Sequence, residues 1–571
     1  MELVELLRKD LKENVAPLAV FTLITGMANA ALISFINTGA EYVTNDQVSH
    51  RVALLFLISL MIYILGKRYV AMRSAVLVEA ILNKIRYRLA DKIRHAELAT
   101  LEARGTSPFY ARLGQDTVKV SNFTASVITA IQAVILIVFT TLYISTISIK
   151  AFVLVTIMLS VCFLVYSSRR KVFRTMWLKL SEYETRFYEK LGHILDGFKE
   201  IKINRSKNES VLQDFALVNE EMKDYKTGLV QAYIRLSIFS QAFFFILLGS
   251  VIFVFPQFHE EYATNIIKIT AAILFISGPF EIVLNGNQQL ANANSSARNI
   301  LELEAELEEV LRQNEMTIEA QNHPEAFEEL PFSDNIRFHN LSFAYPPVKG
   351  RDYIFEVGPI DLTIKKGELI FITGGNGSGK STFLKLMTGL YQPKAGQILV
   401  DVDEAGRPDT TVTPANYQQY RNLFTTIFTD FHLFDKLYGI RETDPADINA
   451  VLKNMELPAD KTTYRNGGFT NLRLSTGQKK RLALTTCIIE DKPIYIFDEV
   501  AADLDPEFRD KYYYQIIREL RARNKTVIVV SHDRYYWTVP DRLLEMANGK
   551  MRELTRAEID SLLKLNKPAG D

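Results

Sequence analysis

The chain has 571 residues, which is too long for one hydrophobic core, so we expect at least two domains. Lysine plus arginine and aspartate plus glutamate both number 66, and the resulting net charge of zero gives no indication of a nucleic-acid partner. The two cysteines, Cys162 and Cys487, lie in an apolar run and among helix-forming residues, so the sequence implies no disulfide framework.

The N-terminal half contains six apolar segments that could span a bilayer, which takes roughly 20 residues in a helix. One such segment could be a buried helix of a soluble protein, but six of them favour a membrane domain. The first of them lacks the cleavage pattern of a signal peptide. The expected spans are about Val15–Asn37, Val52–Val70, Ala125–Thr146, Ala151–Tyr166, Ile238–Phe255 and Ile266–Val283.

The basic residues of the connecting loops predict how these spans are oriented. Lysine and arginine are absent from Glu41–Ser49 and Pro256–Asn265, whereas Lys67–Lys119 and Arg169–Lys226 are rich in both. Positively charged loops stay on the cytoplasmic side. We therefore place the N-terminus, the two long loops and the C-terminal half in the cytoplasm.

Both long loops continue the helical periodicity of the spans, so their helices should project well beyond the bilayer. In the first loop, Ser107 and Pro108 are typical of the N-cap and first residue of a short helix, Phe109–Leu113. The second loop has Asp196–Lys202 at its expected tip. Short helices at these tips could dock onto a cytoplasmic domain, and plain connecting turns are the alternative.

A change of composition marks the expected domain boundary. Leu301–Arg312 is rich in glutamate and predicts a solvated helix, while Gln313–Asp334 is polar, contains two prolines and predicts a linker. We therefore predict a membrane domain over residues 1–312, a linker over 313–334 and a second domain over 335–571.

The second domain carries a complete G-x-x-x-x-G-K-[ST] phosphate loop at Gly374–Ser381. It follows the apolar run Leu369–Thr373 and precedes a helix-like run, which is the context that such a loop needs. Its backbone N–H groups should surround phosphate oxygens, with the helix start adding positive potential. We expect Lys380 to reach the β- and γ-phosphates and Ser381 to hold Mg²⁺.

Residues beside this loop complete the expected nucleotide site. Tyr345 ends the strand-like run Ile336–Tyr345, and an aromatic upstream of a phosphate loop can stack on adenine. The expected nucleotide-binding residues are Tyr345, Gly374, Asn376, Gly377, Ser378, Gly379, Lys380, Ser381 and Thr382.

Two further apolar runs end in polar side chains. The run from Ile494 ends at Asp498 and Glu499, where the aspartate suits a Mg²⁺ contact through water and the glutamate can polarise the attacking water. Thr526–Val530 is followed by Ser531, His532 and Asp533. Because parallel α/β sheets place their chemistry at the carboxyl ends of strands, these residues should lie near the phosphate loop.

The motif Leu474-Ser475-Thr476-Gly477-Gln478 precedes a helix-like run, Lys479–Glu490. With the phosphate loop and the two strand ends, in this order, it resembles the ATP-binding cassette (ABC) transporters of the exporter type over nearly the whole chain. By this resemblance Leu474, Ser475, Thr476, Gly477 and Gln478 form the family signature, Glu499 is the catalytic glutamate, Asp505 belongs to the D-loop and His532 is the switch histidine.

The resemblance implies a fold and an activity. The fold is an exporter-like membrane α-helical domain of six transmembrane helices, followed by an α/β P-loop ATP-binding cassette. The activity is ATP-driven transport with ATP and Mg²⁺ as cofactors, in a multi-pass protein of the bacterial inner membrane. Ser475 and Gly477 of one copy would complete the site built on Lys380 of another, so the resemblance implies a homodimer.

Two positions depart from the usual family pattern. Thr476 stands where the signature normally has glycine, and Thr429, followed by Asp430, stands where the Q-loop normally has glutamine. Both departures resemble the bacterial branch that exports cyclic peptides and siderophores, as does Gly278-Pro279-Phe280 in the sixth span. The cargo implied is a cyclic peptide, a peptide antibiotic or a siderophore-like compound, with a periplasmic or outer-membrane partner left open.

The transport path is the least constrained part. Glu281 lies in or near the sixth span, where a carboxylate is costly, so it either contacts a polar or cationic substrate or already lies in water. Asn285 follows it towards a polar cavity or exit, and Gln132 and Gln241 are further candidates whose alternative role is hydrogen bonding between helices.

Other functions remain as alternatives. A lipid flippase or multidrug exporter would use the same architecture, and an ATP-sensing regulator or gated channel would use the cassette without pumping. Intact Glu499 and His532 argue against the regulator. A peptidase-containing exporter is not expected, because the few residues before Val15 could not form a protease.

Overall fold

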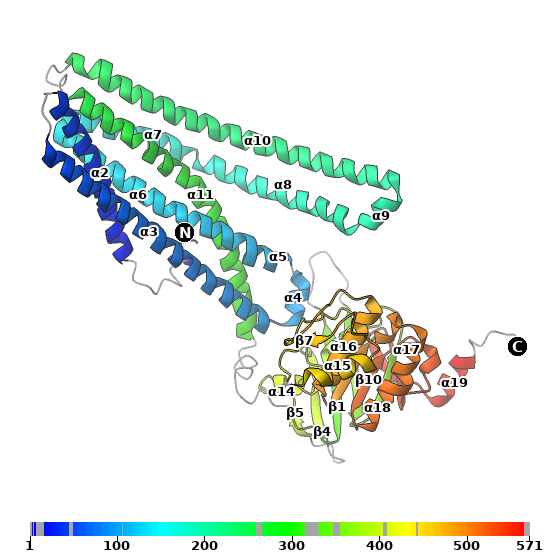
Figure 1. Ribbon diagram of the computed structural model, residues 1–571. Coiled ribbons are helices and arrows are strands. Elements are labelled where there is room, and N and C mark those ends of the chain that lie inside the picture. The colour runs from blue at the N-terminus through cyan, green and yellow to red at the C-terminus, as the bar shows by residue number, and fades with distance from the viewer. Residues whose placement is uncertain are drawn as a thin grey trace. The chain divides into compact units, whose positions relative to one another are not determined.

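The computed structural model describes residues 3, 5–6, 16–44, 49–105, 107–258, 265–313, 330–345, 355–402, 408–440 and 443–564 (Figure 1). Most of the expected linker, residues 314–329, lies outside this part of the chain, as does Val15 at the start of the first expected span. The chain divides into two compact units. Unit 1 comprises Met1–Ile93 and Ser107–Glu306, and unit 2 comprises Arg94–Thr106 and Leu307–Asp571.

Unit 1 is helical, and six helices in the described residues are long and apolar enough to cross a membrane, which confirms the six expected spans. The α-helices are α2 (Ala16–Thr44), α3 (His50–His95), α5 (Ser107–Tyr110), α6 (Thr117–Ile147), α7 (Ile149–Ser168), α8 (Arg170–Asp196), α9 (Phe198–Ile203), α10 (Arg205–Gly249) and α11 (Ile266–Gln313). Polar side chains cap the N-termini of two of these helices. The Ser148 hydroxyl accepts from the Ala151 N–H at 3.1 Å at the start of α7, and the Asn204 side chain accepts from the Lys207 N–H at 3.0 Å at the start of α10.

The second long loop has the predicted form. In Figure 1, α8 and α10 run side by side and are joined by the short helix α9, at the expected tip. Two π-helical turns, Ala111–Asp116 and Ser250–Val254, interrupt the long helices, and a short 3₁₀ turn, Phe255–Phe258, follows the second of them.

One expectation for unit 1 is wrong. The segment Phe109–Leu113 is not a separate docking helix, because the chain from Ser107 runs through a π-helical turn directly into α6. Leu301–Arg312 is helical and most of its glutamates are exposed, as expected, but it is the end of the 48-residue helix α11. One of its glutamates, Glu304, is 2% exposed because Arg88 and Lys92 of α3 form ion pairs with it. A buried charge that is paired in this way is tolerated.

Unit 2 contains a six-stranded sheet in the order β12-β11-β3-β10-β9-β6, in which only the edge strand β12 is antiparallel. The strands β3, β9 and β10 are buried along their whole length, as their apolar sequences predict. The strands of this sheet are β3 (Leu369–Thr373), β6 (Phe424–Ile427), β9 (Ile494–Asp498), β10 (Thr526–Val530), β11 (Arg542–Ala547) and β12 (Lys550–Glu553).

A four-stranded antiparallel sheet, in the order β2-β1-β4-β5, forms the second layer of this unit. One core cluster joins both sheets through apolar residues of α13, among them Phe383 and Leu384. The strands are β1 (Asn335–Ala344), β2 (Glu356–Lys365), β4 (Ala395–Val402) and β5 (Pro408–Thr411), and a small hairpin pairs β7 (Tyr464–Arg465) with β8 (Gly468–Phe469).

Helices cover the sheets of unit 2, and one of them, α4, comes from the first long loop. The α-helices are α4 (Leu98–Arg104), α13 (Lys380–Met387), α14 (Tyr417–Arg421), α15 (Pro445–Asn454), α16 (Thr476–Glu490), α17 (Pro506–Lys511), α18 (Ile517–Ala522) and α19 (Arg556–Lys564). Short turns lie at Val500–Asp503, Tyr512–Ile516 and Arg534–Tyr536. This topology places the ends of β3, β9 and β10 next to one another, which is where the predicted site residues lie.

Candidate functional site

The phosphate loop has the backbone that its glycines predict. Gly374, Gly377 and Gly379 have φ angles of 147°, 74° and 107°, which favour glycine. At Gly374 a Cβ atom would lie 2.1 Å from the carbonyl oxygen of Met546, so no larger residue fits without a backbone shift. The loop therefore turns from the end of β3 into the first turn of α13, where N–H groups are free to bind an anion.

Lys380 is the first residue of α13 and is 6% exposed. Its Nζ donates to the carbonyl oxygens of Gly374 and Gly375, both at 3.0 Å. Burial lowers the Lys380 pKa, and the negative charges of Glu499 and Asp498 partly oppose this shift. A buried ammonium group without a paired carboxylate is suited to receive the charge of a phosphate.

Asp498 lies at the end of β9 and is 1% exposed. The hydroxyls of Ser381 and Thr429 both donate to its Oδ2, at 2.9 Å and 3.0 Å, while its Oδ1 has no hydrogen-bond partner in the described residues. Burial raises the Asp498 pKa, and the two hydroxyls oppose that shift. An orphaned carboxylate oxygen beside two hydroxyls is a set of hard oxygen donors, which fits Mg²⁺ completed by phosphates and water.

Thr429 therefore lies where the sequence places the Q-loop, and its hydroxyl reaches the same carboxylate oxygen as Ser381. The neighbouring Asp430 is exposed. Of the two residues at the Q-loop position, Thr429 contacts Asp498, and no hydrogen bond of the described residues joins Asp430 to it.

Glu499 and His532 face each other across the ends of β9 and β10. The imidazole Nε2 lies 3.0 Å from the Glu499 Oε1, and both side chains are partly exposed. Glu499 has a φ of 53°, an uncommon left-handed conformation for a glutamate. Its backbone is held on both sides, because its N–H donates to Val530 and its carbonyl accepts from Lys480 Nζ at 2.8 Å.

Lys480 was not predicted from the sequence. It is buried, and its ammonium also forms an ion pair with Asp503 at 2.6 Å, so it ties the signature helix α16 to the segment after Glu499. The signal that could have found it is a lysine within the apolar face of a helix, next to the signature motif.

The signature segment begins α16 with a capping box: Ser475 accepts from the Gln478 N–H, and the Gln478 side chain accepts from the Ser475 N–H. Ser475 and Thr476 are exposed, and Leu474 is buried. A Cβ atom at Gly477 would lie 2.8 Å from the Asp503 carbonyl oxygen, so this position needs glycine. Among the described residues, no hydrogen bond or ion pair joins this segment to the phosphate loop.

The D-loop residue Asp505 caps α17 by accepting from the Phe508 N–H at 3.0 Å, and it forms an ion pair with Arg481 of α16. Tyr345 lies near the phosphate loop, since its hydroxyl is 3.0 Å from that of Thr382. Its ring meets Phe343 edge to face at a centroid distance of 5.2 Å. Asn376 and Gly377 are exposed, and the buried Ser378 hydroxyl has no hydrogen-bond partner within the part of the chain that the structure describes.

The membrane candidates are only partly brought together. Glu281 on α11 is half-buried and accepts from the Ser237 hydroxyl of α10 at 3.5 Å. Gln132 on α6 is half-buried and Gln241 on α10 is exposed, and no hydrogen bond of the described residues links either to Glu281. The Asn285 side chain lies outside the described residues.

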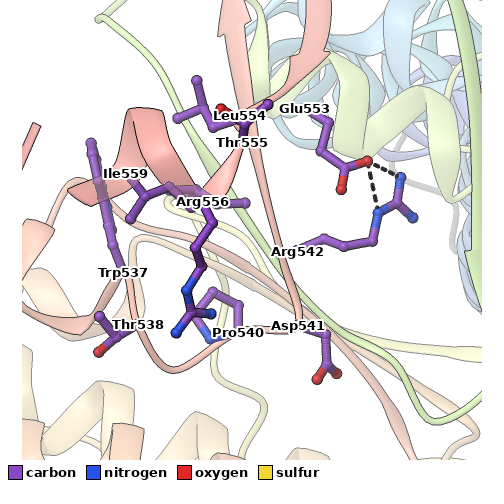
Figure 2. A pocket seen from close by; sticks show the side chains of 11 residues that line it. Trp537, Thr538, Pro540, Asp541, Arg542, Glu553, Leu554, Thr555, Arg556 and Ile559 are labelled. Carbon is purple, nitrogen blue, oxygen red and sulfur yellow. Dashed lines mark hydrogen bonds and ion pairs between the residues drawn. The ribbon is translucent and has the colours of Figure 1, made fainter. Parts of the chain in front are cut away.

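A small cavity of about 190 Å³ lies elsewhere on unit 2, beside α19 (Figure 2). Trp537 and Pro540 line it, and Arg542 on its wall donates two hydrogen bonds to Glu553, at 3.0 Å and 2.8 Å. None of its lining residues belongs to the predicted site, and one of its two arginines, Arg542, is already paired with Glu553. This cavity is therefore not part of the candidate site.

Comparison with known proteins agrees with this geometry. The family model described as ABC transporter matches residues 357–502. The chain is 28% identical to the ATP-binding protein SyrD of Pseudomonas syringae pv. syringae over 93% of both chains. It is 29% identical to an ATP-dependent lipid A-core flippase of Chromohalobacter salexigens over 47% of this chain and 45% of that protein. It is 30% identical to the arginine transport ATP-binding protein ArtM of Bacillus subtilis over 34% of this chain and 82% of that protein.

Proposed function

Since this chain belongs to the ABC transporter family, we propose that it exports a cyclic peptide, peptide antibiotic or siderophore-like compound. ATP binding by the cassette, ATPase-coupled export and a multi-pass location in the inner membrane with a cytoplasmic cassette follow from the family and the six spans. The finer cargo assignment rests on the motifs that resemble the peptide and siderophore branch. The likeness to SyrD extends over the membrane region as well as the cassette. The departures Thr476 and Thr429 support the same branch.

We propose a membrane domain over residues 1–312, a linker over 313–334 and an ATP-binding cassette over 335–571, as the sequence predicts. In the cassette, Lys380 and the N–H groups of Gly374–Ser381 would bind the phosphates, and Tyr345 would stack on adenine. Ser381, Asp498 and Thr429 would hold Mg²⁺, which when bound neutralises charge on the phosphates.

Glu499 is proposed to orient and polarise the attacking water. Its carboxylate is partly exposed, near the phosphate loop that holds the buried Lys380 ammonium group. His532, 3.0 Å from that carboxylate, would hold its orientation and contact the γ-phosphate. The backbone bonds of Glu499 to Val530 and Lys480 keep its left-handed conformation in place.

We further propose that two copies form a homodimer in the membrane. The exposed Ser475 and Thr476 lie at the start of α16, free to complete the phosphate site of a second copy. ATP would then favour the closed pair of cassettes, and loss of the γ-phosphate would release them. Export follows because closure is coupled to rearrangement of the membrane helices, with α9 expected to dock on the second copy's cassette.

Glu281 is the candidate that would select the cargo. It lies within the apolar span Ile266–Leu284, and Ser237 is its hydrogen-bond partner in the described residues. A carboxylate in a membrane span is costly unless it serves a ligand or an aqueous path. Gln132, Gln241 and Asn285 are proposed to lie along the same path.

The test is the ATPase activity of the purified protein in lipid vesicles, with cyclic peptides, siderophores, bacterial lipids and common drugs added in turn. Glu499→Gln prepared in parallel measures contaminating ATPases. Stimulation by peptides or siderophores alone supports the proposal. Stimulation by lipids or drugs alone would instead support the second candidate, a lipid or multidrug flippase, which the likeness to lipid A-core flippases favours. ATP binding without hydrolysis would point to a regulator.

A further inference from the structure

Helix α4 is built into the cassette unit although its neighbours in sequence, α3 and α5, belong to unit 1. Leu98 and Ala99 of α4 pack against the core cluster that contains α13 and both sheets. Glu102, in its last turn, binds residues of the cassette, while Glu97 lies at the N-cap without a capping hydrogen bond. Any shift of α4 within this unit must therefore be passed along the chain to α3 and α5.

Glu102 binds two residues next to the phosphate loop. Its Oε1 accepts from Lys385 Nζ at 2.6 Å, and its Oε2 accepts from the Tyr391 hydroxyl. Tyr391 is 1% exposed and stacks on Phe343 with a centroid distance of 4.5 Å. Lys385 is also largely buried, with its ammonium 5.5 Å from the Tyr391 ring. The contact of Glu102 with Tyr391 is partly buried, whereas its contact with Lys385 lies at the exposed surface.

A line of tyrosine rings leads from Glu102 towards the nucleotide site. The Tyr391 ring meets the Tyr345 ring edge to face at a centroid distance of 5.9 Å, and the Tyr345 hydroxyl lies 3.0 Å from that of Thr382. A carboxylate can only accept, so the Tyr391 hydroxyl donates its proton to Glu102.

Thr382 and Lys385, where this network begins, lie close to the proposed phosphate site. Thr382 and Lys385 belong to the eight-residue helix α13, which begins with Lys380 and Ser381 of the phosphate loop. Tyr345 is the aromatic proposed to stack on adenine. A rotation of the Tyr345 ring or a small shift of α13 would change the contacts of Tyr391 and Lys385, and both of these hold Glu102.

A second basic residue lies near the other end of α4. Burial raises the pKa of Glu97, and the positive charge of Arg421 partly opposes this shift. Arg421 itself donates to the Gly389 carbonyl through two nitrogens, and its guanidinium lies over the Tyr417 ring at 5.3 Å. Because the apolar residues at the start of α4 pack against the core, changes at Glu102 would tilt the helix rather than release it.

We propose that Glu102, Tyr391 and Tyr345 form a positioning relay through which nucleotide bound to the cassette sets the position of α4. The relay rests on the proposed nucleotide site and adds to it a path to the membrane helices that does not use Thr429. It accounts for how a chain without the Q-loop glutamine can couple ATP to its membrane domain. Glu102 and Tyr391 are positioning residues and lie outside the proposed phosphate and Mg²⁺ site.

The test is amide hydrogen exchange of residues 98–104 in the full-length protein in lipid, with and without saturating ATP in EDTA. EDTA prevents hydrolysis and removes any contribution of the metal site around Asp498. We expect ATP to change exchange in α4 by at least about threefold in the wild type, since local opening there depends on the contacts of Glu102. Tyr391→Phe should abolish this change while labelled ATP binds with an affinity within about threefold.

Tyr512→Phe is the matched control, because Tyr512 is equally buried in the cassette but its hydroxyl has no hydrogen-bond partner in the described residues. Glu102→Gln, which keeps the acceptor and loses the charge, serves as the second variant if Tyr391→Phe folds poorly. An ATP response of α4 in Tyr391→Phe or Glu102→Gln equal to that in Tyr512→Phe would overturn the relay. No cargo is added, so a wrong cargo assignment does not affect the result. If the wild type does not bind ATP at all, the proposed nucleotide site is refuted instead of the relay.

Discussion

At Asp498, burial and hydrogen bonds act in opposite directions on one carboxyl. Burial raises its pKa, while Ser381 and Thr429 lower it because they donate to the charged form. Thr429→Ala removes one donor, so the pKa should rise further and the carboxylate should be lost at a higher pH. We expect the acid limb of the ATPase pH profile to move to higher pH in Thr429→Ala and to stay in place in Thr429→Ser. An unmoved limb in Thr429→Ala would contradict the role of Thr429.

Glu499 offers the sharpest single substitution. Glu499→Gln keeps the side-chain shape and removes the negative charge that would polarise water, so we expect ATP hydrolysis to fall by about 100-fold or more. ATP should still bind and hold the dimer closed, which cross-linking of paired cassettes would detect. Glu507→Gln, at an exposed site on α17, is the control. Wild-type hydrolysis in Glu499→Gln would remove Glu499 from the mechanism.

At the scale of elements, the start of α16 combines a stability role with a functional one. The capping box and the close approach of Gly477 to the Asp503 carbonyl hold the signature against the D-loop segment. Gly477→Ala places a Cβ atom 2.8 Å from that oxygen, so the signature must shift. We expect ATPase activity to fall by at least about tenfold and the thermal midpoint to drop by a few degrees.

Thr476→Gly is the matched control for Gly477→Ala, since Thr476 is exposed and the change restores the residue that the family usually has. Its cost should stay below about 1 kcal/mol, which is typical of glycine in a helix. Thermal unfolding of both variants in detergent, beside their ATPase rates, measures the difference. Equal behaviour of the two variants would mean that the close approach of Gly477 has no role.

The elements that bear the predicted site could be read from the sequence because their patterns are local. The run Thr526–Val530 is apolar throughout and forms β10 over the same residues, and the glycines of the phosphate loop predicted its left-handed turns. Helix α4 could not be found in this way. Its sequence is an ordinary continuation of the first long loop, and its place is set by the distant partners Lys385 and Tyr391.

At the scale of the whole molecule, composition alone predicted six spans, because an apolar run of that length has few alternatives. The membership of Arg94–Thr106 in unit 2 was out of reach of the sequence, since it depends on tertiary contacts and not on local composition. The burial of Glu304 has the same origin: a glutamate predicts solvent exposure until Arg88 and Lys92 are known to lie beside it.

The proposed homodimer can be tested with dimers whose two copies carry different substitutions. Lys380→Ala removes the ammonium group that would bind the phosphates, and Ser475→Arg blocks the signature segment at the start of α16. Within one chain, the signature segment has no hydrogen bond to the phosphate loop in the described residues. If each site takes its loop from one copy and its signature from the other, a mixed dimer of the two single variants keeps one intact site. A dimer of the wild type with the double variant then has none.

We therefore expect ATPase activity in doubly tagged, co-purified dimers of Lys380→Ala with Ser475→Arg, at up to about half the wild-type rate, if the sites act independently. The dimer of the wild type with the double variant should be inactive. The two results are reversed if each cassette completes its own site, because the double variant then spares its wild-type partner. The comparison uses the same two substitutions in both samples, so their effects on folding cancel, and the pattern of activity depends only on which chain supplies the signature.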